Sequence, residues 1–300
     1  MFVTYSKIGE NGRLGNQLFQ YAAIKGLAAK LNYTPILPFG IENRYWHGQK
    51  CLLHDLFDLD ISIKNITEPL ITKTPIFKGC DDPDIFNCHL SANVNIDQFP
   101  ESEYYFKHIK NEIKKEFTIK ETAKTYAIDY INSIKNNKEQ IVAIHIRRGD
   151  TLDCSDNRYI INGIANTDHC TESEWLLNYL QNTINKFDAT KYKFLIFSGG
   201  SRISNNLSDI EWCEYYFNKY FPMLDVSYSK NNKDIDDFII FTLCNHAILT
   251  SLSTFGWWGA YLINDKNKVV YVPDINKVDK NNNYWKTSGS KFWADEFTLI

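Results

Sequence analysis

The feature that most constrains the fold is an alternation of strand and helix patterns in the second half of the chain. Residues 141–146 form an almost unbroken apolar run, of the kind found in strands buried on both faces of a parallel sheet. Such alternation is typical of a doubly wound α/β domain, which we expect over residues 139–275. The strands are expected at 141–146, 192–198, 225–228, 247–250 and 268–272, and the helices at 172–187, 210–221, 234–244 and 256–263.

The first half of the chain shows a weaker form of the same pattern. A strand, a glycine-containing loop, a helix and a second strand follow one another, which is the first unit of an α/β layer. From residue 40 to 99, Pro, Asp and Asn interrupt short apolar pieces, and no element is predicted there. The expected elements are strands at 2–8 and 34–39, with helices at 16–31, 104–117 and 122–134.

The polar run from Lys135 to Gln140 is the predicted linker between two domains. We therefore expect an N-terminal α/β domain at 1–138 and a C-terminal α/β domain at 139–275. A tail at 276–300 carries Trp285, Phe292 and Trp293 and is expected to pack on the body. Two such domains would face each other across a cleft, and ligands of α/β folds bind at the carboxyl ends of the strands.

Charge and cysteine content narrow the function classes. Lys and Arg number 33 against 36 Asp and Glu, so a net charge of −3 offers no basic field for nucleic acid. The seven cysteines contain no Cys-x-x-Cys pair and the seven histidines show no zinc spacing, so we expect reduced thiols and no metal. No apolar run reaches the ~18 residues of a membrane span, and no signal peptide is visible. We therefore expect a cytoplasmic protein, at most peripheral to a membrane.

The segment His-Ile-Arg-Arg-Gly-Asp, residues 145–150, ends the buried strand. The guanidinium groups of Arg147 and Arg148 can each donate two parallel hydrogen bonds to the oxygens of a phosphate. Gly149 lets the backbone turn close to a ligand, and Asp150 is placed to orient a guanidinium or to accept a proton. His145 has two interpretations, a buried hydrogen-bonded histidine or a residue that lines the site, and the neighbouring arginines favour the second.

A second segment, Gly-Arg-Leu-Gly-Asn-Gln-Leu-Phe-Gln-Tyr-Ala at residues 12–22, joins the first strand to the first helix. Glycines at such a turn, with the N–H groups of the helix N-terminus, suit an oxyanion or a sugar. The pattern is neither Gly-x-Gly-x-x-Gly nor a P-loop, so it supports neither dinucleotide nor Mg·ATP binding. For Asn16, capping of the helix is an equally good explanation.

A third segment, residues 251–262, places hydroxyl groups before a short aromatic helix. Ser251, Ser253 and Thr254 together with the N–H groups of the helix N-terminus form a cradle for an anion. Trp257 and Trp258 are interpreted as core residues rather than as a stacking platform for a ligand.

An acidic turn, Asp-Ile-Asp-Asp at residues 234–237, opens the helix that precedes the third segment. From a helix start, Asp236 or Asp237 can hydrogen-bond a ribose or the edge of a base. Capping of the helix explains the same residues equally well.

Taken together, these segments resemble the bacterial-type α-1,2-fucosyltransferases of glycosyltransferase family 11. The matching segments occur in the order of the family and cover both halves of the chain, whereas residues 40–135 carry no detailed resemblance. The matches are at 12–22, 145–150, Asp-Asp-Phe at 236–238, Cys-Asn-His at 244–246 and Ser-Thr-Phe-Gly-Trp-Trp-Gly-Ala-Tyr-Leu at 253–262.

The resemblance implies a GT-B architecture, in which the N-terminal domain faces the acceptor and the C-terminal domain holds GDP-fucose. It also implies inverting, metal-independent transfer of L-fucose from GDP-β-L-fucose to a glycan hydroxyl, the 2-OH of a galactoside, with no cofactor. By position, Arg147 and Arg148 would grip the diphosphate; Ser253, Thr254 and Phe255 would line its pocket; Asp237 would serve the nucleoside; and Gly15 and Asn16 would approach the sugar-phosphate from the other domain.

Two places depart from the family pattern. The usual Phe-Ser-Asp-Asp is here Phe197-Ser198-Gly199-Gly200, followed by an extra segment before Asp209. Leu252 replaces the usual Asn, and Gly256 replaces the usual Ser. A nucleoside contact near residue 199 and one polar contact to the donor are therefore expected to be absent or supplied elsewhere.

An inverting displacement can use a base on the acceptor hydroxyl. Asp150 and His145 are the nearest candidates, followed by Asp153, Asp156 and Glu172; a dissociative route with a weak base is the alternative. Two other function classes stay open. One is a metal-dependent GT-A transferase that uses an Asp-x-Asp pair, and the other is a non-catalytic nucleotide- or carbohydrate-binding protein on the same scaffold.

Overall fold

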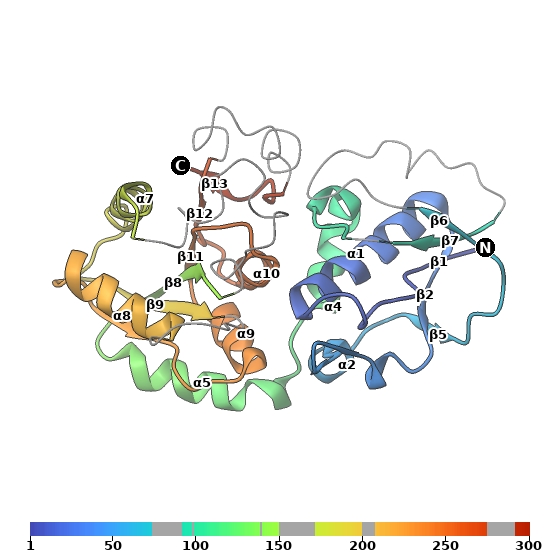
Figure 1. Cartoon of the computed structure of the whole chain (residues 1–300), viewed down its shortest axis with the longest axis horizontal. Coiled ribbons are helices and arrows are strands. Elements are labelled where there is room, and N and C mark those ends of the chain that lie inside the picture. Colours follow the sequence, from blue (N-terminus) through green and yellow to red (C-terminus); the bar gives the residue numbers. More distant parts are fainter. Residues whose placement is uncertain (74–91, 98, 139, 150–171, 200–207, 275–291) are drawn as a thin grey trace. The chain divides into compact units, whose positions relative to one another are not determined.

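The computed structural model of the chain describes residues 1–73, 92–97, 99–138, 140–149, 172–199, 208–274 and 292–300. These residues form two compact units (Figure 1). Unit 1 contains residues 1–123 and 292–295, and unit 2 contains the described residues from 124 to 274 together with 296–300.

Unit 1 is built on a parallel sheet in the order β5-β2-β1-β7-β6. From β1 the chain moves outward through β2 to β5; it then crosses to the other edge at β6 and returns inward to β7, beside β1. The strands are β1 (Phe2–Thr4), β2 (Thr34–Pro38), β5 (Ser62–Lys64), β6 (Leu70–Lys73), β7 (Asn93–Ile96) and the hairpin β3 (Tyr45–Trp46) and β4 (Gln49–Lys50); the helices are α1 (Leu14–Leu31), α2 (Leu53–Leu56) and α4 (Lys110–Glu116), with 3-10 turns η1 (Ile41–Asn43), η2 (Glu103–Tyr105) and η3 (Lys107–Ile109).

Helix α1 is the centre of unit 1, because it is apolar on almost every side and 13 of its 18 residues are buried. It ends at Asn32, which takes the left-handed conformation that favours Asn and Gly at helix C-termini. Gly26 lets η2 approach closely, since a Cβ there would lie 2.0 Å from the carbonyl oxygen of Tyr105. The lack of a side chain at this position therefore sets the packing of α1 on η2.

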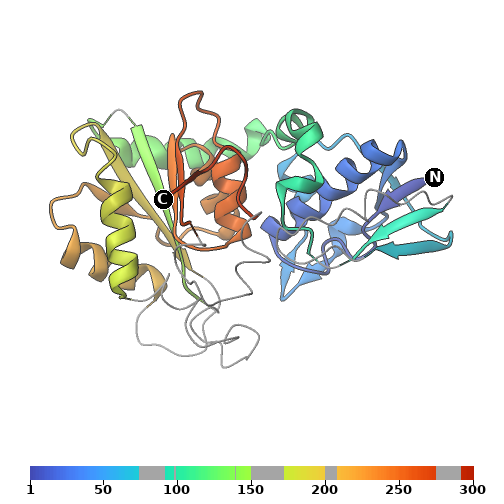
Figure 2. The same ribbon diagram turned by 90° about the horizontal axis from the view of Figure 1, so that it is seen from above.

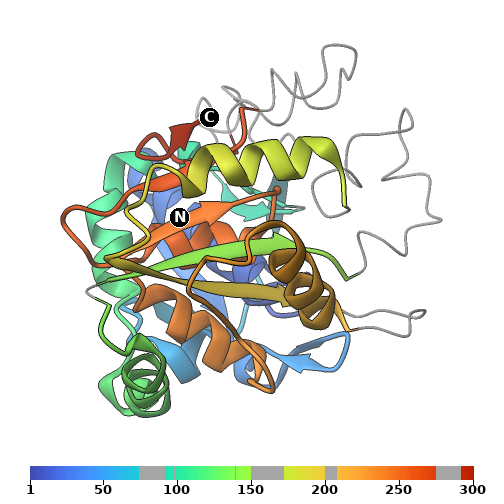
Figure 3. The ribbon, with the colours of Figure 1, turned by 90° about the vertical axis from the view of Figure 1, so that its left-hand side faces the viewer.

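Unit 2 contains a six-stranded parallel sheet in the order β10-β9-β8-β11-β12-β13 (Figure 3). The eight residues of β8 are apolar on both faces apart from its ends and His145, as a central parallel strand requires. The strands are β8 (Gln140–Arg147), β9 (Tyr192–Gly199), β10 (Val226–Tyr228), β11 (His246–Leu249), β12 (Val270–Val272) and β13 (Thr298–Leu299); the helices are α5 (Glu121–Lys135), α7 (Glu174–Ile184), α8 (Asp209–Tyr220), α9 (Asp234–Thr242) and α10 (Thr254–Tyr261).

Helices cover both faces of the unit 2 sheet (Figure 2). On one face, α7 and α8 pack on Val142, Ile144 and Ile146 in a shared apolar cluster. On the other face, Phe241 of α9 and Phe255 of α10 contact the ring of His145. Because successive strand residues point to opposite faces, each residue of β8 is committed to one helical layer.

The strands and helices predicted for the second half of the chain are confirmed, with ends that shift by a few residues. The three elements predicted at 2–8, 16–31 and 34–39 are also confirmed as β1, α1 and β2. The region from 40 to 99, for which no element was predicted, contains strands β5, β6 and β7 of the unit 1 sheet. The helix predicted at 104–117 is split into η2, η3 and α4.

The two units divide at residues 123 and 124, before most of α5, whereas the sequence predicted a division at 138 and 139. The difference arises from the contacts of α5. Its Tyr126 donates a hydrogen bond to Oδ1 of Asn232 (2.5 Å), and its Tyr130 donates one to the carbonyl of Tyr228 (3.2 Å). Lys135, the first residue of the predicted linker, is the last residue of this helix, and residues 136–138 follow it inside unit 2.

Candidate functional site

The order of strands in unit 2 indicates where a ligand binds. The winding changes direction between β8 and β11, and ligands of such sheets bind beyond the carboxyl ends of the strands at that point. The turn Arg148–Gly149 follows β8, and Thr250–Ser253 follows β11. Both the N–H and the hydroxyl of Thr250 donate to the carbonyl of His145, at 3.2 and 3.1 Å, which ties the two strand ends together.

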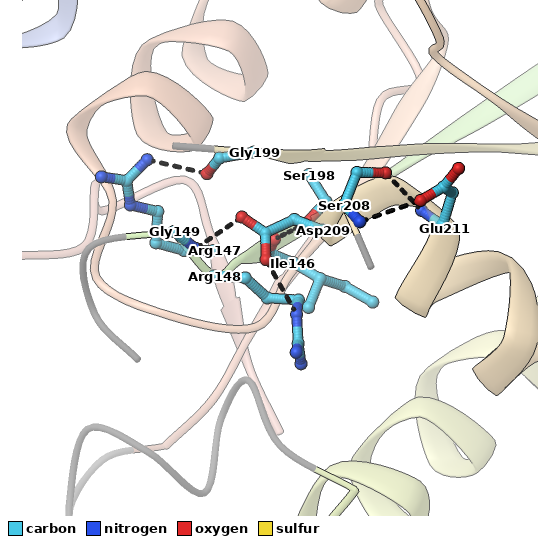
Figure 4. A network of polar contacts seen from close by, with 9 residues as sticks. All are labelled: Ile146, Arg147, Arg148, Gly149, Ser198, Gly199, Ser208, Asp209 and Glu211. Atoms are coloured by element: carbon cyan, nitrogen blue, oxygen red, sulfur yellow. Dashed lines mark hydrogen bonds and ion pairs between the residues drawn. The ribbon is translucent and has the colours of Figure 1, made fainter. Parts of the chain in front are cut away.

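Arg147 and Arg148 point in different directions from the end of β8 (Figure 4). Arg147, on the same face as His145, is half-buried and donates from Nη1 to the carbonyl of Gly199 at 3.0 Å. Arg148 is 4% exposed, and its guanidinium carbon lies 3.6 Å from the ring centroid of Trp212 in α8. The sequence analysis treated the two arginines as one phosphate-binding group, but their side chains lie on opposite faces of the unit 2 sheet.

The carboxylate of Asp209, the first residue of α8, lies between the turn after β8 and the helix (Figure 4). Its Oδ1 accepts a hydrogen bond from Nε of Arg148 (3.3 Å) and its Oδ2 accepts one from the N–H of Gly149 (2.8 Å). Gly149 has φ +55°, a conformation that glycine adopts without strain. Asp209 therefore holds the backbone that directly follows Arg147.

Helix α8 is fixed at its start by a capping box. Oγ of Ser208 accepts from the N–H of Glu211 (3.2 Å), and the carboxylate of Glu211 accepts from the N–H of Ser208 (2.9 Å). The sequence analysis did not single out Asp209 or Trp212 as site residues. The pattern Ser-x-x-Glu at 208–211 is the signal that locates the start of this helix, and thus an acid beside the strand ends.

The N-terminus of α10 follows β11 on the face that Arg147 shares. Ser253 is the N-cap residue and is buried, and Thr254 and Phe255 begin the helix half-buried. The three residues predicted to line an anion pocket are therefore at the helix start, where N–H groups attract negative charge. Trp257 and Trp258 are fully buried, as predicted for core residues.

His145 lies inside unit 2 and is 4% exposed. Its ring packs on Phe255 (centroids 5.5 Å apart), and burial together with the charge of Arg147 lowers its pKa to about 3. No described residue hydrogen-bonds its Nδ1. A Cβ at position 256 would lie 2.8 Å from that atom, so Gly256, which replaces the family's usual Ser, gives the imidazole room. The first interpretation of His145, a buried histidine, describes its surroundings, except that Nδ1 has no such partner.

Asp237 is half-buried in the first turn of α9. Its Oδ1 accepts hydrogen bonds from the hydroxyl of Ser229 and from Nδ2 of Asn232 (3.1 Å). Burial raises the pKa of this carboxyl above its ordinary value. The acid thus belongs to a polar group at the end of β10, and it does not act as the N-cap, which is Lys233.

Gly15 and Asn16 lie in the first turn of α1 in unit 1. The N-cap of this helix is Arg13, so Asn16 is not the capping residue that the sequence allowed. The side chain of Asn16 is half-buried and packs on Gly12, where a Cβ would lie 2.4 Å from Nδ2. Gly12 has φ +97°, so both its conformation and its space require glycine.

Some candidates for the base cannot be placed. Asp150, Asp153 and Asp156 lie outside the described residues. Glu172 is described, and its Oε1 accepts from Nζ of Lys219 and from the hydroxyl of Tyr220 in α8. These contacts lower the pKa of Glu172 and are those of an ion pair at the surface of unit 2.

In the described parts of the chain, no three His, Cys, Asp or Glu side chains gather as a group that could hold a metal ion. Within the same residues, no helix combines the length and the apolar character needed to cross a membrane.

The site has the form of an anion-binding site: a half-buried arginine and a helix N-terminus at the switch point of a parallel sheet. The class of protein is thus an α/β protein with parallel sheets. The sequence matches Glycosyl transferase family 11 over residues 4–293, and the chain belongs to this family. It is therefore a glycosyltransferase, as the sequence resemblance predicted.

Curated relatives are 25–28% identical to this chain over the aligned residues. An alpha-1,2-colitosyltransferase of Escherichia coli is 28% identical over 279 residues, which cover 84% of this chain and 86% of the relative. The Galactoside alpha-(1,2)-fucosyltransferase 2 of Mus musculus is 25% identical over 270 residues, which cover 85% of this chain and 67% of the relative.

Solved structures confirm the fold. The apo form of POFUT1 matches with a TM-score of 0.54 at 13% identity, covering 90% of this chain and 97% of POFUT1. NodZ alpha-1,6-fucosyltransferase soaked with GDP-fucose matches with a TM-score of 0.51 at 12% identity, covering 87% of this chain and 92% of NodZ. The expected α/β fold of the GT-B type is confirmed.

Proposed function

We propose that this glycosyltransferase moves L-fucose from GDP-β-L-fucose to a glycan acceptor, at the 2-OH of a galactoside, with inversion at the sugar and without a metal ion. The observation that carries the proposal is the position of Arg147. It stands at the carboxyl end of the central strand of unit 2, on the face of the sheet that α10 covers.

The charge that develops in the reaction explains this arrangement. Breaking the bond between sugar and phosphate leaves negative charge on the departing GDP, and fixed donors aimed at that charge stabilise the transition state. Arg147 supplies a guanidinium, and the start of α10 supplies N–H groups and the hydroxyls of Ser253 and Thr254. Attack by the acceptor from the opposite side of the sugar inverts the configuration.

The remaining candidates take supporting roles in this proposal. Asp237, whose Oδ1 is contacted by Ser229 and Asn232, would accept hydrogen bonds from the nucleoside. His145 packs beneath Phe255 and is a positioning residue rather than the base, because it is buried and its pKa is low. Asn16 and Gly15 of unit 1 would contact the sugar-phosphate.

The relatives support the choice of sugar and linkage. Two mammalian relatives are named galactoside alpha-(1,2)-fucosyltransferases, from mouse and from human, and both match over more than four fifths of this chain. POFUT1 and NodZ have been solved with GDP-fucose, and their likeness in fold is compatible with the same donor.

Calorimetric titration with GDP, UDP and ADP in EDTA tests the donor part of the proposal. Selective binding of GDP is the expected result, and preference for UDP or a requirement for Mn²⁺ would overturn it. Incubation with GDP-β-L-fucose and a galactoside, followed by NMR of the product, tests the rest. The expected product carries an α-linked fucose on O2, and a β-linked or differently linked product would contradict inversion or the 2-OH.

A second candidate sugar is colitose. The E. coli relative that is named for its transfer is covered by this chain over 86% of its length, more than the mouse relative at 67%. A competition between fucosyl and colitosyl donors in the same assay decides between the two sugars.

A further inference from the structure

The carboxylate of Asp209 makes two hydrogen bonds to the turn that directly follows Arg147. It thereby joins α8, the helix that follows β9, to a turn about 60 residues earlier in the chain. Both side chains of the ion pair are nearly inaccessible, at 5% exposed for Arg148 and 4% for Asp209. A buried charge that loses its partner is strongly unfavourable, so the geometry of this pair is tightly constrained.

Two contacts, one at its edge and one on its face, hold the guanidinium of Arg148. Asp209 contacts its Nε, and the ring of Trp212, one helical turn along α8, covers its face at 3.6 Å. Asp209 and Trp212 are three residues apart and therefore lie on the same side of the helix. Because the capping box of Ser208 and Glu211 fixes the start of α8, both contacts have a rigid base.

The same carboxylate also fixes the main chain. The N–H of Gly149 donates to Oδ2 of Asp209 at 2.8 Å, two residues after Arg147. On the other side of Arg147, β8 and β9 are in register at Ile146 and Ser198, where the hydroxyl of Ser198 donates to the carbonyl of Ile146 (2.8 Å). Arg147 thus lies between two anchored points of backbone.

We propose that Asp209 is a positioning residue for the donor site, which acts through the turn Arg148–Gly149 to aim Arg147 at the diphosphate of the donor. This inference rests on the proposed function. Arg147 contacts the diphosphate, and Arg148 belongs to the internal support together with Asp209 and Trp212. The family pattern of two adjacent arginines accordingly combines one ligand-binding residue with one positioning residue.

Binding of GDP and GMP at a temperature well below unfolding tests the proposal, since only GDP carries the second phosphate. In Arg147→Ala we expect GDP affinity to fall about 100-fold, and in Asp209→Asn and Arg148→Gln about tenfold, while GMP affinity stays within about twofold of wild type. Asp209→Asn keeps the shape and one acceptor oxygen but removes the charge. An unchanged ratio of GDP to GMP affinity in Asp209→Asn would overturn the proposal.

A double variant separates positioning from direct contact. If Asp209 acts through Arg147, then Asp209→Asn adds nothing to the loss of GDP affinity in the Arg147→Ala background. A full additional tenfold loss would show that Asp209 acts on the ligand by another route. A fall in GDP affinity for Arg148→Gln as large as for Arg147→Ala would make Arg148 a direct ligand and overturn the division of roles.

Asp225→Asn is the matched control. Asp225 pairs with buried Lys193 at 2.7 Å, but at the amino end of β9, at the edge of the sheet opposite the site. We expect lower thermal stability and an unchanged ratio of GDP to GMP affinity, and a change in this ratio as large as that of Asp209→Asn would show that any lost ion pair has this effect.

Two further results keep the test decisive. If Asp209→Asn does not fold, Trp212→Leu removes the covering ring at a half-buried position, and we expect GDP affinity to fall about threefold with GMP unchanged; no change would contradict the proposal.

If the wild type itself does not prefer GDP to GMP, the proposed function fails and the inference fails with it. A normal preference in the wild type that Asp209→Asn retains overturns the inference alone.

Discussion

The two units solve the same structural problem with different chemistry. Each has a parallel sheet, and in each a glycine-containing turn follows the first strand of that sheet. In unit 1 several side chains hold the turn after β1: Gln17 donates to the carbonyl of Gly12 (3.2 Å), Asn95 accepts from the N–H of Ser6 (2.8 Å), and Nη1 of Arg44 donates to the carbonyls of Ser6 (2.5 Å) and Ile8 (3.1 Å). In unit 2 the turn after β8 is held by the charged pair of Arg148 and Asp209.

This difference is one of burial. The ion pair beside the turn of unit 1, Arg44 with Glu10, has side chains that are 18% and 51% exposed, whereas those of Arg148 and Asp209 are 5% and 4% exposed. An exposed ion pair contributes little, but a buried charge must keep its partner, so the buried pair constrains its turn more tightly. The proposal above assigns the diphosphate of the donor to this more tightly constrained turn of unit 2.

The largest expected effect tests the assignment of the diphosphate to the turn of unit 2. In Arg147→Ala, transfer should fall about a hundred- to a thousandfold, the usual loss when a fixed donor to transition-state charge is deleted. Arg147→Lys should recover little of the rate, because an ammonium lacks the planar fork. Initial rates with GDP-fucose measure the effect, and unchanged circular dichroism and Tm serve as controls. Rates near wild type would contradict the assignment of the diphosphate to the turn of unit 2.

The next effect compares close packing in the two units. Gly26→Ala in α1 should lower the free energy of unfolding by about 3 kcal/mol, since the new Cβ meets a backbone oxygen of η2 that cannot move alone. Gly259→Ala in α10 meets ring atoms of Phe241 at 2.8 Å, and a side chain adjusts more easily, so we expect about 1 kcal/mol. Urea denaturation measures both. Equal losses would mean that the two helices tolerate crowding alike.

A third effect uses pH, because the turn of unit 2 has a buried imidazole next to it. The pKa of His145 is about 3 in the folded chain and near 6.5 when unfolded, so the unfolded state binds the proton first. Stability due to neutral His145 is complete above pH 6.5 and is lost as the pH falls toward 3, by at most about 1.4 kcal/mol per pH unit.

The matched variant is His145→Gln, which cannot titrate. Between pH 6.5 and 4 its free energy of unfolding should fall less steeply than that of the wild type, as measured by urea denaturation at several pH values. Parallel curves for the two proteins would place the ring of His145 in contact with solvent.

The smallest expected effect concerns the capping of helix N-termini in the two units. Ser208→Ala breaks the capping box of α8 and should cost about 1 kcal/mol of stability. In unit 1, helix α1 begins at Leu14, and its N-cap residue Arg13 makes no side-chain capping hydrogen bond. Thermal melts of Ser208→Ala and of Ser208→Thr, which keeps the hydroxyl, test whether the cap itself is responsible.

Most of unit 2 could be predicted from sequence, because its strands are apolar on both faces and alternate with helices of regular period. Strand β7 of unit 1 could not. Its Asn93 and Asn95 alternate with Val94 and Ile96, and Asn is unfavourable in strands. The two amides accept hydrogen bonds from the N–H groups of Phe2 and Ser6, partners that are visible only once the sheet is assembled.

The candidate site likewise contains residues whose positions the sequence predicts and residues whose roles it does not. The positions of Arg147, Ser253 and Thr254 at the ends of adjacent strands follow from local patterns and from the general rule for parallel sheets. The role of Asp209 depends on a contact across about 60 residues of chain, which no local pattern contains. The opposite directions of Arg147 and Arg148 do follow from the alternation of side chains along a strand, although the sequence analysis treated them as a pair.

The last residues of the chain are shared between the units. Phe292 packs on Phe19, and the N–H of Asp295 donates to Glu103 (2.9 Å), both within unit 1. A few residues later, β13 pairs with β12 and Phe297 contacts Trp257 within unit 2. During synthesis on the ribosome, unit 1 therefore emerges first but obtains its final pieces only after nearly all of unit 2 has been made. A fragment that stops at the boundary between the units would lack those pieces and leave part of the α1 core uncovered.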